Sequence, residues 1–466
     1  MTRTSDTAAV KIPPVSPMVR DRMSSRAREL LTLAIIAISG VGLRAVSLLK
    51  TGIDFAVAPD SVGYIGLADG LRKGCGFARL INGACSAPEI LRTPGFPLML
   101  AGIPNLRYAI AVQAFIGGGL SFCLGRFVWR RWGSKAGIAA ALLVALDVPS
   151  IIASSYILTE TLFTGLFVAA VLIQMSLIWR RKFDSAAVAL GLLAAIMLGY
   201  AALVRPIGQI YVLLAPLPFF FMSELSRKRK VQLSALALIL PLLLVGAWIG
   251  RNGLERGWYG ESAIQAENVY LYRAAGVIWY RQGSLNIENF HRIQDRLTND
   301  LCAANPGYCK TADGLREMQK RGMQICLSDI PAVAVVSLAS FIYVSVTPYS
   351  SQLYNVLDVP RLKADSFNHR YREILGSPSI VLLTGLCALM VLFLWSGIFR
   401  FVLHFDRNSA DVLVLYPLIL GLSMIALAAG PEAVDFRLRV PSIPFLAIAA
   451  AVGWFRDRRS PVRIPS

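Results

Sequence analysis

Long uninterrupted runs of apolar residues, separated by short polar segments, are the main pattern of this chain. Ten runs predict one membrane-crossing helix each, because roughly 17–25 apolar residues in a helix cross about 30 Å of hydrocarbon. They lie at about 30–49, 108–127, 136–154, 158–178, 185–203, 208–223, 232–250, 379–400, 410–430 and 440–455. The apolar residues form blocks rather than alternating with polar ones as in half-buried strands. The pattern therefore predicts an all-α polytopic membrane protein.

One further apolar segment, "PAVAVVSLASFIYVSV" at 331–346, is ambiguous. It is short for a span and contains several serines, so we interpret it as an amphipathic helix on the outer surface. Whether this segment is an eleventh crossing stays open. A crossing here would place every later loop on the other side of the membrane. The Lys and Arg residues of those loops are equally numerous on both sides and do not decide the question.

The basic residues lie between the apolar runs rather than in one patch. The net charge is +19, yet only 16% of the residues are charged and the mean hydropathy is +0.57. Short clusters at 130–135, 180–182, 226–230 and 456–459 follow the positive-inside rule. This distribution argues against a nucleic-acid partner and places the N-terminal tail inside. The first run contains Arg44 and no convincing cleavage site follows it, so we expect a retained helix rather than a signal peptide.

Two large polar pieces then fall on the outer side, at about 51–107 and 251–377. The predicted division of the chain is a cytoplasmic basic tail at 1–28, an N-terminal transmembrane module at 29–257 that includes the outer loop 51–107, a periplasmic or juxtamembrane segment at 258–377, C-terminal transmembrane helices at 378–455 and a cytoplasmic tail at 456–466.

Each outer piece contains two cysteines that are close in sequence, Cys75 with Cys85 and Cys302 with Cys309. Pairing within each piece would suit an oxidising periplasm. Small buried thiols are the alternative.

The first outer loop contains two candidate surface helices with polar residues at their starts. "PDSVGYIGLADGLRKG" (59–74) has helical spacing that places Tyr64 and apolar residues on one face. Asp60 just precedes its first turn and is either an N-cap or an ionised general base, two roles that are compatible. "LRTPGFPLMLAG" (91–102) predicts the second helix and holds Arg92 at its entrance, where Arg92 either snorkels to lipid headgroups or pairs with a phosphate.

Charged residues also stand at the outer ends of several predicted spans, where a charge is costly unless it is paired. They are Glu160, Arg205, Arg251, Asp435, Arg437 and Arg439. One such residue would mean little by itself. Several acids and arginines at one depth suggest a site for an anionic lipid-linked group at the outer leaflet.

The sequence lacks the residue patterns of an ATP-driven mechanism and of a histidine-rich metal centre. No Walker-type Gly-rich loop is present, and His291, His369 and His404 stand apart, so neither an ATP-driven mechanism nor a histidine-rich metal centre is expected. Cofactor use is not fixed by the sequence, and an acid-bound Mg²⁺ or Mn²⁺ stays open.

The motifs, taken in order, resemble the GT-C superfamily of integral membrane glycosyltransferases. They are "PDSVGYIGLADGL", "RTPGFPLMLAG", "LTETLF", "LVRP", "WIGRNG" and "FRLRVPSIPFL", within about residues 30–455. The nearest resemblance is to glycosyltransferase family 39-like bacterial members, which are related to protein O-mannosyltransferases and the lipid A aminoarabinose transferase. It implies a GT-C-like bundle of about ten transmembrane helices, or eleven, with surface helices in the first outer loop and a larger second periplasmic segment.

The resemblance also implies residue roles. The implied catalytic residues are Asp60, which falls on the acid that deprotonates the acceptor, and Glu160, which falls on the acid that opens a later helix. Arg92 falls on the basic residue before a Pro-containing element and is implied to bind the substrate. The other implied substrate-binding residues are Tyr64, Arg205, Arg251, Arg437 and Arg439. Relatives often carry a second acid where Ser61 stands here, so Asp54 is an alternative base.

The implied activity is an inverting transfer of a hexosyl or pentosyl group from a polyprenyl-phosphate donor. The acceptor would be a glycan, lipid or protein of the envelope. The enzyme would lie among the lipids of the bacterial inner membrane, with its active site facing the periplasm. A polysaccharide polymerase or ligase and a lipid-linked sugar transporter or flippase are the alternatives. Charge at the edges of the spans rather than at the midplane, without an internal repeat, favours the transferase over the transporter.

Overall fold

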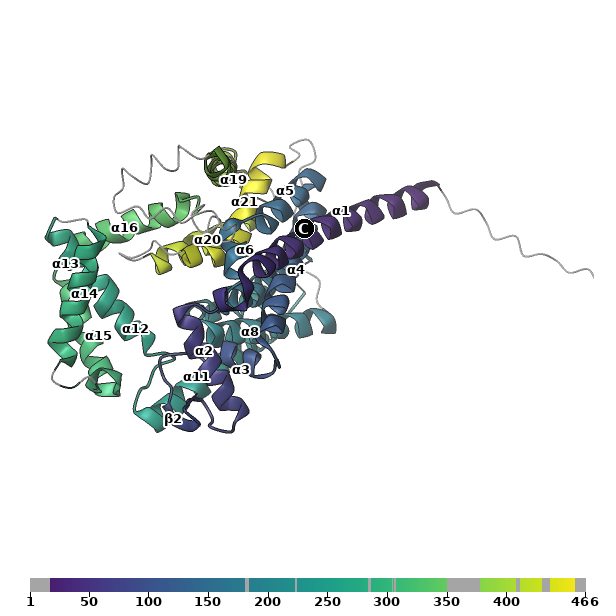
Figure 1. Cartoon of the computed structure of the whole chain (residues 1–466). Helices are drawn as coiled ribbons and strands as arrows, with labels where there is room; N and C mark the ends of the chain where they lie inside the picture. The colour runs from purple at the N-terminus through teal and green to yellow at the C-terminus, as the bar shows by residue number, and fades with distance from the viewer. Residues whose placement is uncertain are drawn as a thin grey trace, which may run out of the picture.

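The computed structural model describes residues 17–180, 184–222, 224–283, 286–303, 305, 307–349, 378–407, 411–429 and 436–456. Within these residues the chain is helical, apart from one two-stranded hairpin. A bundle of apolar helices forms the larger part, and the helices α13 to α15 stand beside it as an arm (Figure 1).

Six helices of the described part are long and apolar enough to cross a membrane. They are α1 (Pro17–Phe55), α4 (Leu106–Trp132), α7 (Glu160–Arg180), α8 (Ser185–Val204), α11 (Arg227–Arg256) and α19 (Pro378–Leu403). Each overlaps one of the predicted spans. The prediction of an all-α polytopic membrane protein is confirmed.

The other four predicted spans correspond to shorter apolar helices. These are α5 (Ser134–Ala145) with α6 (Val148–Ala153), then α9 (Gly208–Tyr211), η1 (Val212–Leu214) and α10 (Leu217–Phe220), then α20 (Val412–Ala428), and finally η5 (Val440–Ser442) with α21 (Ile443–Phe455). One continuous helix over 136–154 is a wrong prediction. The Asp147 side chain accepts from the Ser150 amide at 2.9 Å and so starts α6 as a separate helix.

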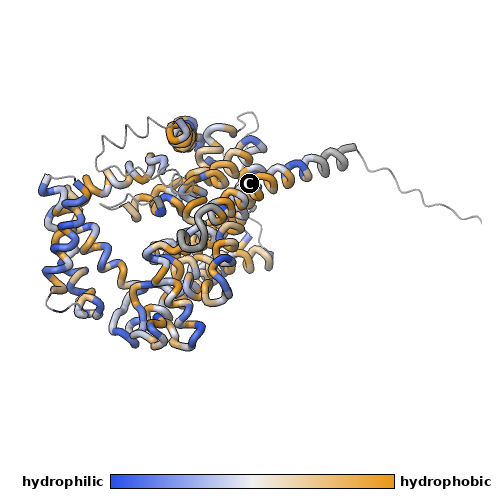
Figure 2. The backbone as a smooth tube through the Cα atoms, in the orientation of Figure 1, coloured by the Kyte–Doolittle hydropathy of each residue, from blue (hydrophilic) through white to orange (hydrophobic). Residues whose placement is uncertain are grey.

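The bundle has a continuous apolar core to which most of these helices contribute. The side chains of α21 are almost all buried, including Phe445, Leu446 and Ile448. Figure 2 shows the corresponding hydrophobic colouring through the bundle, and hydrophilic segments on the arm and around the hairpin.

The first outer loop folds as predicted at its two ends and differently in the middle. Surface helices α2 (Pro59–Arg72) and α3 (Gly95–Ala101) are present. Between them lies an antiparallel hairpin that the sequence analysis did not predict, formed by β1 (Ala78–Ile81) and β2 (Ala84–Pro88).

The second outer segment is a small helical unit with its own core. Its elements are α12 (Ile264–Glu267), the π-helix η2 (Asn268–Ala274), α13 (Ala275–Arg281), α14 (Ile287–Cys302), η3 (Tyr308–Lys310) and α15 (Ala312–Leu327). Ile90 from the first loop is buried in the same core as Trp258 and Tyr270. The two outer pieces are thus packed together.

The ambiguous segment 331–346 forms α16 (Ile330–Val346), which is bent by 97° from α15. Its exposed side chains are apolar, among them Val335, Leu338 and Ile342, whereas Ser340 and Ser345 are buried. The amphipathic interpretation is therefore wrong. An apolar exposed face suits contact with lipid, and α15 and α16 together could count as a seventh long span.

Both predicted cysteine pairs are present as disulfides, Cys75–Cys85 and Cys302–Cys309. Cys75–Cys85 links the end of α2 to the hairpin, and Cys302–Cys309 closes the turn after α14. Cys123, Cys326 and Cys387 are free thiols.

Candidate active site

Asp60 lies in the first turn of α2 and binds two arginines. Its Oδ1 is 2.7 Å from Nη2 of Arg92, and its Oδ2 is 2.9 Å from Nη1 of Arg437. The N-cap position belongs to Ala58, and Ser61 Oγ accepts from the Ala58 amide at 3.0 Å. Asp60 is therefore not the N-cap, and both of its carboxylate oxygens face guanidinium groups instead.

Tyr64 lies one helical turn beyond Asp60 and contacts Arg92. The guanidinium carbon of Arg92 is 5.0 Å from the centre of the Tyr64 ring, and Arg92 Nη1 donates to the Tyr64 hydroxyl at 3.4 Å. Phe96 packs edge-on against the same ring at 5.3 Å. Arg92 is thus oriented by a carboxylate on one side and an aromatic face on the other.

A second ion pair joins the start of α7 to the end of α8. Glu160, the first residue of α7, lies 2.6 Å from Nη1 of Arg205, the C-cap residue of α8. Glu160 is buried, with 4% of its side chain exposed. The N-terminus of α7 also favours a negative charge at this position.

The two ion-pair groups belong to one site, because Tyr64 lies within electrostatic range of Asp60, Arg92, Glu160 and Arg205. The loop before α7 is tied to the segment before α2 by the Ile157 amide, which donates to the Ala56 carbonyl at 2.9 Å. This bond holds Glu160 beside α2.

The loop that carries Arg92 is fastened to the end of α8. Thr93 Oγ1 donates to the Val204 carbonyl at 3.0 Å, and the Tyr200 hydroxyl donates to the Gly95 carbonyl at 2.9 Å. A Cβ atom at Gly95 would lie 2.8 Å from the Leu203 carbonyl oxygen, so only glycine allows this close approach. The motif "RTPG" therefore fixes the loop that carries Arg92 to the end of α8, the helix that Arg205 caps.

The electrostatics keep Asp60 ionised. Burial raises the pKa of the Asp60 carboxyl, but the charges and hydrogen bonds of Arg92 and Arg437 outweigh burial, and its pKa lies below the usual value. Burial raises the pKa of Tyr64, so its hydroxyl stays protonated at neutral pH. The site therefore holds an anion between two cations. Because 36% of the Asp60 side chain is exposed, another anion could replace Asp60 at the arginines.

Two of the candidate arginines lie elsewhere. Arg251 donates to the carbonyls of Glu89 and Phe77 and pairs with Glu255 at 2.6 Å. Arg439 is buried, donates to the Thr347 carbonyl at 2.7 Å and lies 3.6 Å from Asp147. Both are engaged with the chain itself, and the proposal below does not use them. Asp435 lies outside the described residues, and so does the side chain of Asp54.

Three further charged residues near the site were not singled out from the sequence. Glu267 on α12 lies within electrostatic range of Arg92 and Glu89, and burial raises its pKa. Arg79 pairs with Glu89 at 2.6 Å and approaches Gly63 on α2. No local motif marks these residues. Only the packing of the second outer segment on the first loop brings Glu267 near.

The described part of the chain contains no group of three or more His, Cys, Asp or Glu side chains placed to hold a metal ion. Both oxygens of Asp60 contact arginines. Dependence on Mg²⁺ or Mn²⁺ is a question for the assay described below.

No protein-family model matches the chain, and no curated protein matches its sequence. Solved structures are similar at low identity. The archaeal oligosaccharyltransferase AglB from Archaeoglobus fulgidus, in complex with an inhibitory peptide and a dolichol-phosphate, has a TM-score of 0.47 and 14% identity, over 92% of this chain and 50% of that chain. This chain thus spans about half the length of that protein.

ArnT from Cupriavidus metallidurans is also similar. Its apo structure has a TM-score of 0.40 and 12% identity, over 92% of this chain and 77% of that chain. The structure bound to undecaprenyl phosphate has a TM-score of 0.36 and 14% identity, over 89% of this chain and 76% of that chain.

Proposed function

We propose that this protein is an inverting glycosyltransferase that moves a sugar from a polyprenyl-phosphate donor to an envelope acceptor on the periplasmic face of the bacterial inner membrane. The observation that carries the proposal is the position of Asp60 between Arg92 and Arg437, beside the Glu160–Arg205 pair. One carboxylate between two guanidinium groups, at the end of apolar helices, suits a lipid-linked phosphate better than it suits a structural role alone.

Arg92 and Arg437 would bind the donor phosphate. Guanidinium groups match phosphate oxygens in geometry and stay charged. As the bond between the anomeric carbon and the phosphate oxygen breaks, one more negative charge develops on the leaving polyprenyl phosphate. Fixed positive groups in a partly buried site stabilise that charge in the transition state.

Asp60 would act as the general base. The acceptor hydroxyl oxygen attacks the anomeric carbon on the face opposite the phosphate, and its proton passes to the Asp60 carboxylate, so the configuration inverts. The incoming phosphate would compete with Asp60 for the two arginines. Loss of those contacts raises the pKa of Asp60 and makes it a stronger base when the donor is in place.

Glu160 would position Arg205 and take no direct part in the reaction. It is buried against Arg205, whereas Asp60 is the more exposed of the two acids. Glu160 fixes the Arg205 guanidinium within electrostatic range of Tyr64, where Arg205 would add positive charge to the site.

The orientation of the site has its own support. The loop that carries Arg92 and the segment that packs on it each contain a disulfide, as expected for an oxidising compartment. The basic clusters of the short loops lie on the opposite side in the predicted topology. The same reasoning favours a donor already linked to a lipid, because soluble nucleotide sugars are confined to the cytoplasm.

The decisive experiment uses the full chain reconstituted in liposomes with polyprenyl-phosphate sugars and envelope extracts, with products identified by mass spectrometry. We expect Asp60→Asn to lower transfer by more than 100-fold, while the protein stays folded and inserted. Asp69→Asn is the matched control, because Asp69 lies on the same helix and pairs only with Arg72 in the described structure. Undiminished transfer by Asp60→Asn would remove Asp60 as the base.

Further conditions separate the alternatives. Transfer only from an oligosaccharide diphosphate donor would indicate a polymerase or ligase, and movement of the lipid-linked sugar across the vesicle without a covalent product would indicate a flippase. Assays with EDTA, and with Mg²⁺ or Mn²⁺ restored, determine the metal dependence. Mass spectrometry of envelope glycans and lipids from a strain that lacks the protein would identify the sugar and the acceptor.

A further inference from the structure

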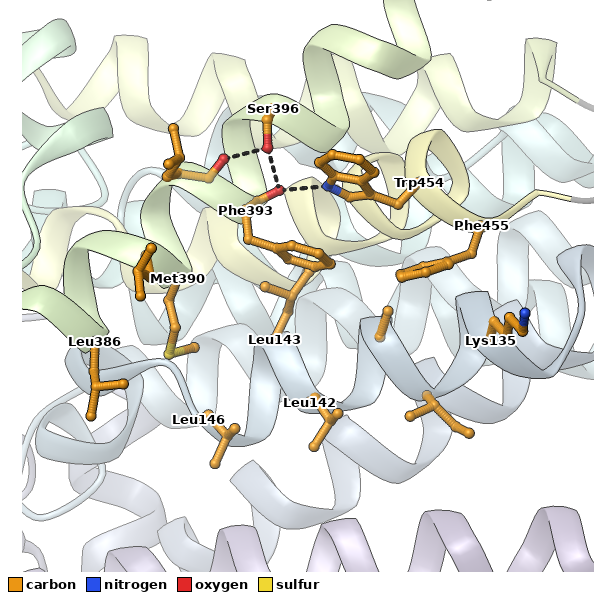
Figure 3. A pocket seen from close by; sticks show the side chains of 14 residues that line it. Lys135, Leu142, Leu143, Leu146, Leu386, Met390, Phe393, Ser396, Trp454 and Phe455 are labelled. Carbon is orange, nitrogen blue, oxygen red and sulfur yellow. Dashed lines mark hydrogen bonds between the residues drawn. The ribbon is translucent and has the colours of Figure 1, made fainter.

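An apolar groove lies between α5, α19 and α21, on a different part of the bundle from the Asp60 site. Its volume is about 920 Å³. Leu142 and Leu146 line one wall, and Leu386, Met390 and Phe393 line the other (Figure 3). Several of these leucines are more than one third exposed, so the groove opens on the outside of the bundle.

Lys135 is the charged residue at one end of the groove. The other polar side chains of the lining already have partners: Trp454 Nε1 donates to the Phe393 carbonyl at 3.0 Å, and Ser396 Oγ donates to the Leu392 carbonyl at 2.5 Å (Figure 3). Lys135 is exposed and has no ion-pair partner among the described residues. Arg400 adds a second positive charge at this end, with its guanidinium 5.4 Å from the centre of the Trp454 ring.

A second, much smaller space adjoins the groove. Leu143 and Met390 also line a second space that continues toward Arg439, but its volume is only about 20 Å³. A cavity of this size holds about one water molecule. Asp147 and Arg439 lie 3.6 Å apart in its wall. In the described structure, no passage wide enough for a hydrocarbon chain leads from the groove to the Arg439 end.

We propose that the groove is a binding site for an anionic phospholipid of the surrounding bilayer, with the headgroup phosphate at Lys135 and Arg400 and an acyl chain along α5. From Lys135 to Leu146 the helix rises about 17 Å, which is close to half of the ~30 Å hydrocarbon core. One acyl chain of one leaflet has this reach. In the predicted topology Lys135 follows a basic cytoplasmic cluster, so the lipid belongs to the inner leaflet.

This site is independent of the transferase proposal. A phospholipid in the groove would cover the apolar faces of α5 and α19 and hold α21 in place between them. Arg437 lies in η4 (Phe436–Leu438), and η5 and α21 follow η4 in the chain. Bound lipid that holds α21 would therefore stabilise the fold near Arg437 without entering the site.

The test is native mass spectrometry of the full chain in detergent, titrated with dioleoylphosphatidylglycerol or dioleoylphosphatidylcholine, together with thermal unfolding under the same conditions. We expect the phosphatidylglycerol to bind more tightly and to raise Tm. Lys135→Gln should weaken its binding about fivefold, the size of one basic side chain's attraction for an anionic lipid surface. Leu142→Trp, which fills the groove, should abolish the preference for phosphatidylglycerol over phosphatidylcholine.

Lys228→Gln is the matched control, because Lys228 is an exposed lysine on α11 outside the groove. It should bind like the parent chain. Equal binding of the two phospholipids, or unchanged binding in Lys135→Gln, would overturn the proposal. Displacement of the phosphatidylglycerol by undecaprenyl phosphate would also overturn it, because the groove would then hold an isoprenoid tail instead.

Discussion

Asp60 Oδ2 lies 2.9 Å from Arg437 Nη1, although 377 residues separate the two. One residue begins a surface helix in the first outer loop, and the other lies in a 3₁₀ turn just before the last helix. The contact therefore joins the N-terminal and C-terminal parts of the chain. Arg92, 32 residues from Asp60, occupies the other carboxylate oxygen.

Arg437→Gln should lower kcat/KM for the donor by about 100- to 1,000-fold, because the site loses one of the charges that stabilise the leaving phosphate. Asp60 would also lose a contact that lowers its pKa. The base then becomes deprotonated only at higher pH, so the acid limb of the rate profile should move to higher pH. Because the Asp60 pKa lies below its usual value, initial rates must extend from about pH 3 to 9 to measure both effects. An unchanged acid limb with reduced kcat/KM would leave Arg437 as a binding residue and separate it from the base.

The effects of replacing Glu160 and Arg205 on the free energy of unfolding should not be additive. Removing one partner leaves an unpaired charge in a largely buried place, so Glu160→Ala or Arg205→Ala alone should destabilise by about 2–3 kcal/mol. The double variant should recover part of that loss, as read from thermal unfolding in detergent. Transfer activity should stay low in the double variant, since Arg205 is absent from the site. Additive losses in the double variant would mean that the pair does not interact.

Glu261 should make stability depend on pH. It lies in the loop after α11, is buried, and has no hydrogen-bond partner for either carboxylate oxygen in the described part of the chain. Burial raises its pKa to about 8. Between about pH 4.5 and 8 the folded protein keeps a proton that the unfolded chain has released. The contribution of Glu261 to the free energy of unfolding is therefore highest below about pH 4.5, and it falls as the pH rises toward 8.

The measurement is Tm from pH 5 to 8 for the parent chain and for Glu261→Gln. The slope contributed by this one group is at most about 1.4 kcal/mol per pH unit. Glutamine keeps the shape without the titration, so its slope should be shallower by that contribution. Parallel slopes in the two proteins would exclude Glu261 as the source.

Four of the seven cysteines should resist alkylation. In denaturant without reductant, we expect a thiol reagent to label three positions, namely Cys123, Cys326 and Cys387. After reduction it should label all seven. Replacing both Cys75 and Cys85 by serine should destabilise the first outer loop by about 2–3 kcal/mol, the usual cost of losing a short closed loop. Full labelling before reduction would place these loops in a reducing compartment.

The residues of the proposed site were largely accessible from sequence by two criteria. Asp60 and Arg92 appear at the starts of the two predicted surface helices of the first outer loop. Glu160, Arg205 and Arg437 appear as charges at predicted span ends, where an unpaired charge is costly. The same criterion also selected Arg251 and Arg439, which the structure engages with carbonyls and with Glu255 or Asp147. Sequence position gives depth in the membrane, but it does not give the direction in which a long side chain points.

The sequence by itself determined the class of protein and the approximate helices, because apolar length and charge distribution are local properties. It suggested the cysteine pairs from their short separation but left buried thiols as the alternative. Tertiary structure decided which charges meet. Asp60 joins Arg437 only because α2 packs near the final turn of the chain, and Glu267 approaches Arg92 only because Ile90 is buried in the core of the second outer segment. It also decided that α16 exposes an apolar face. These outcomes depend on contacts between distant segments. The break of 136–154 at Asp147 is different, because the Asp147–Ser150 cap that causes it is local in sequence.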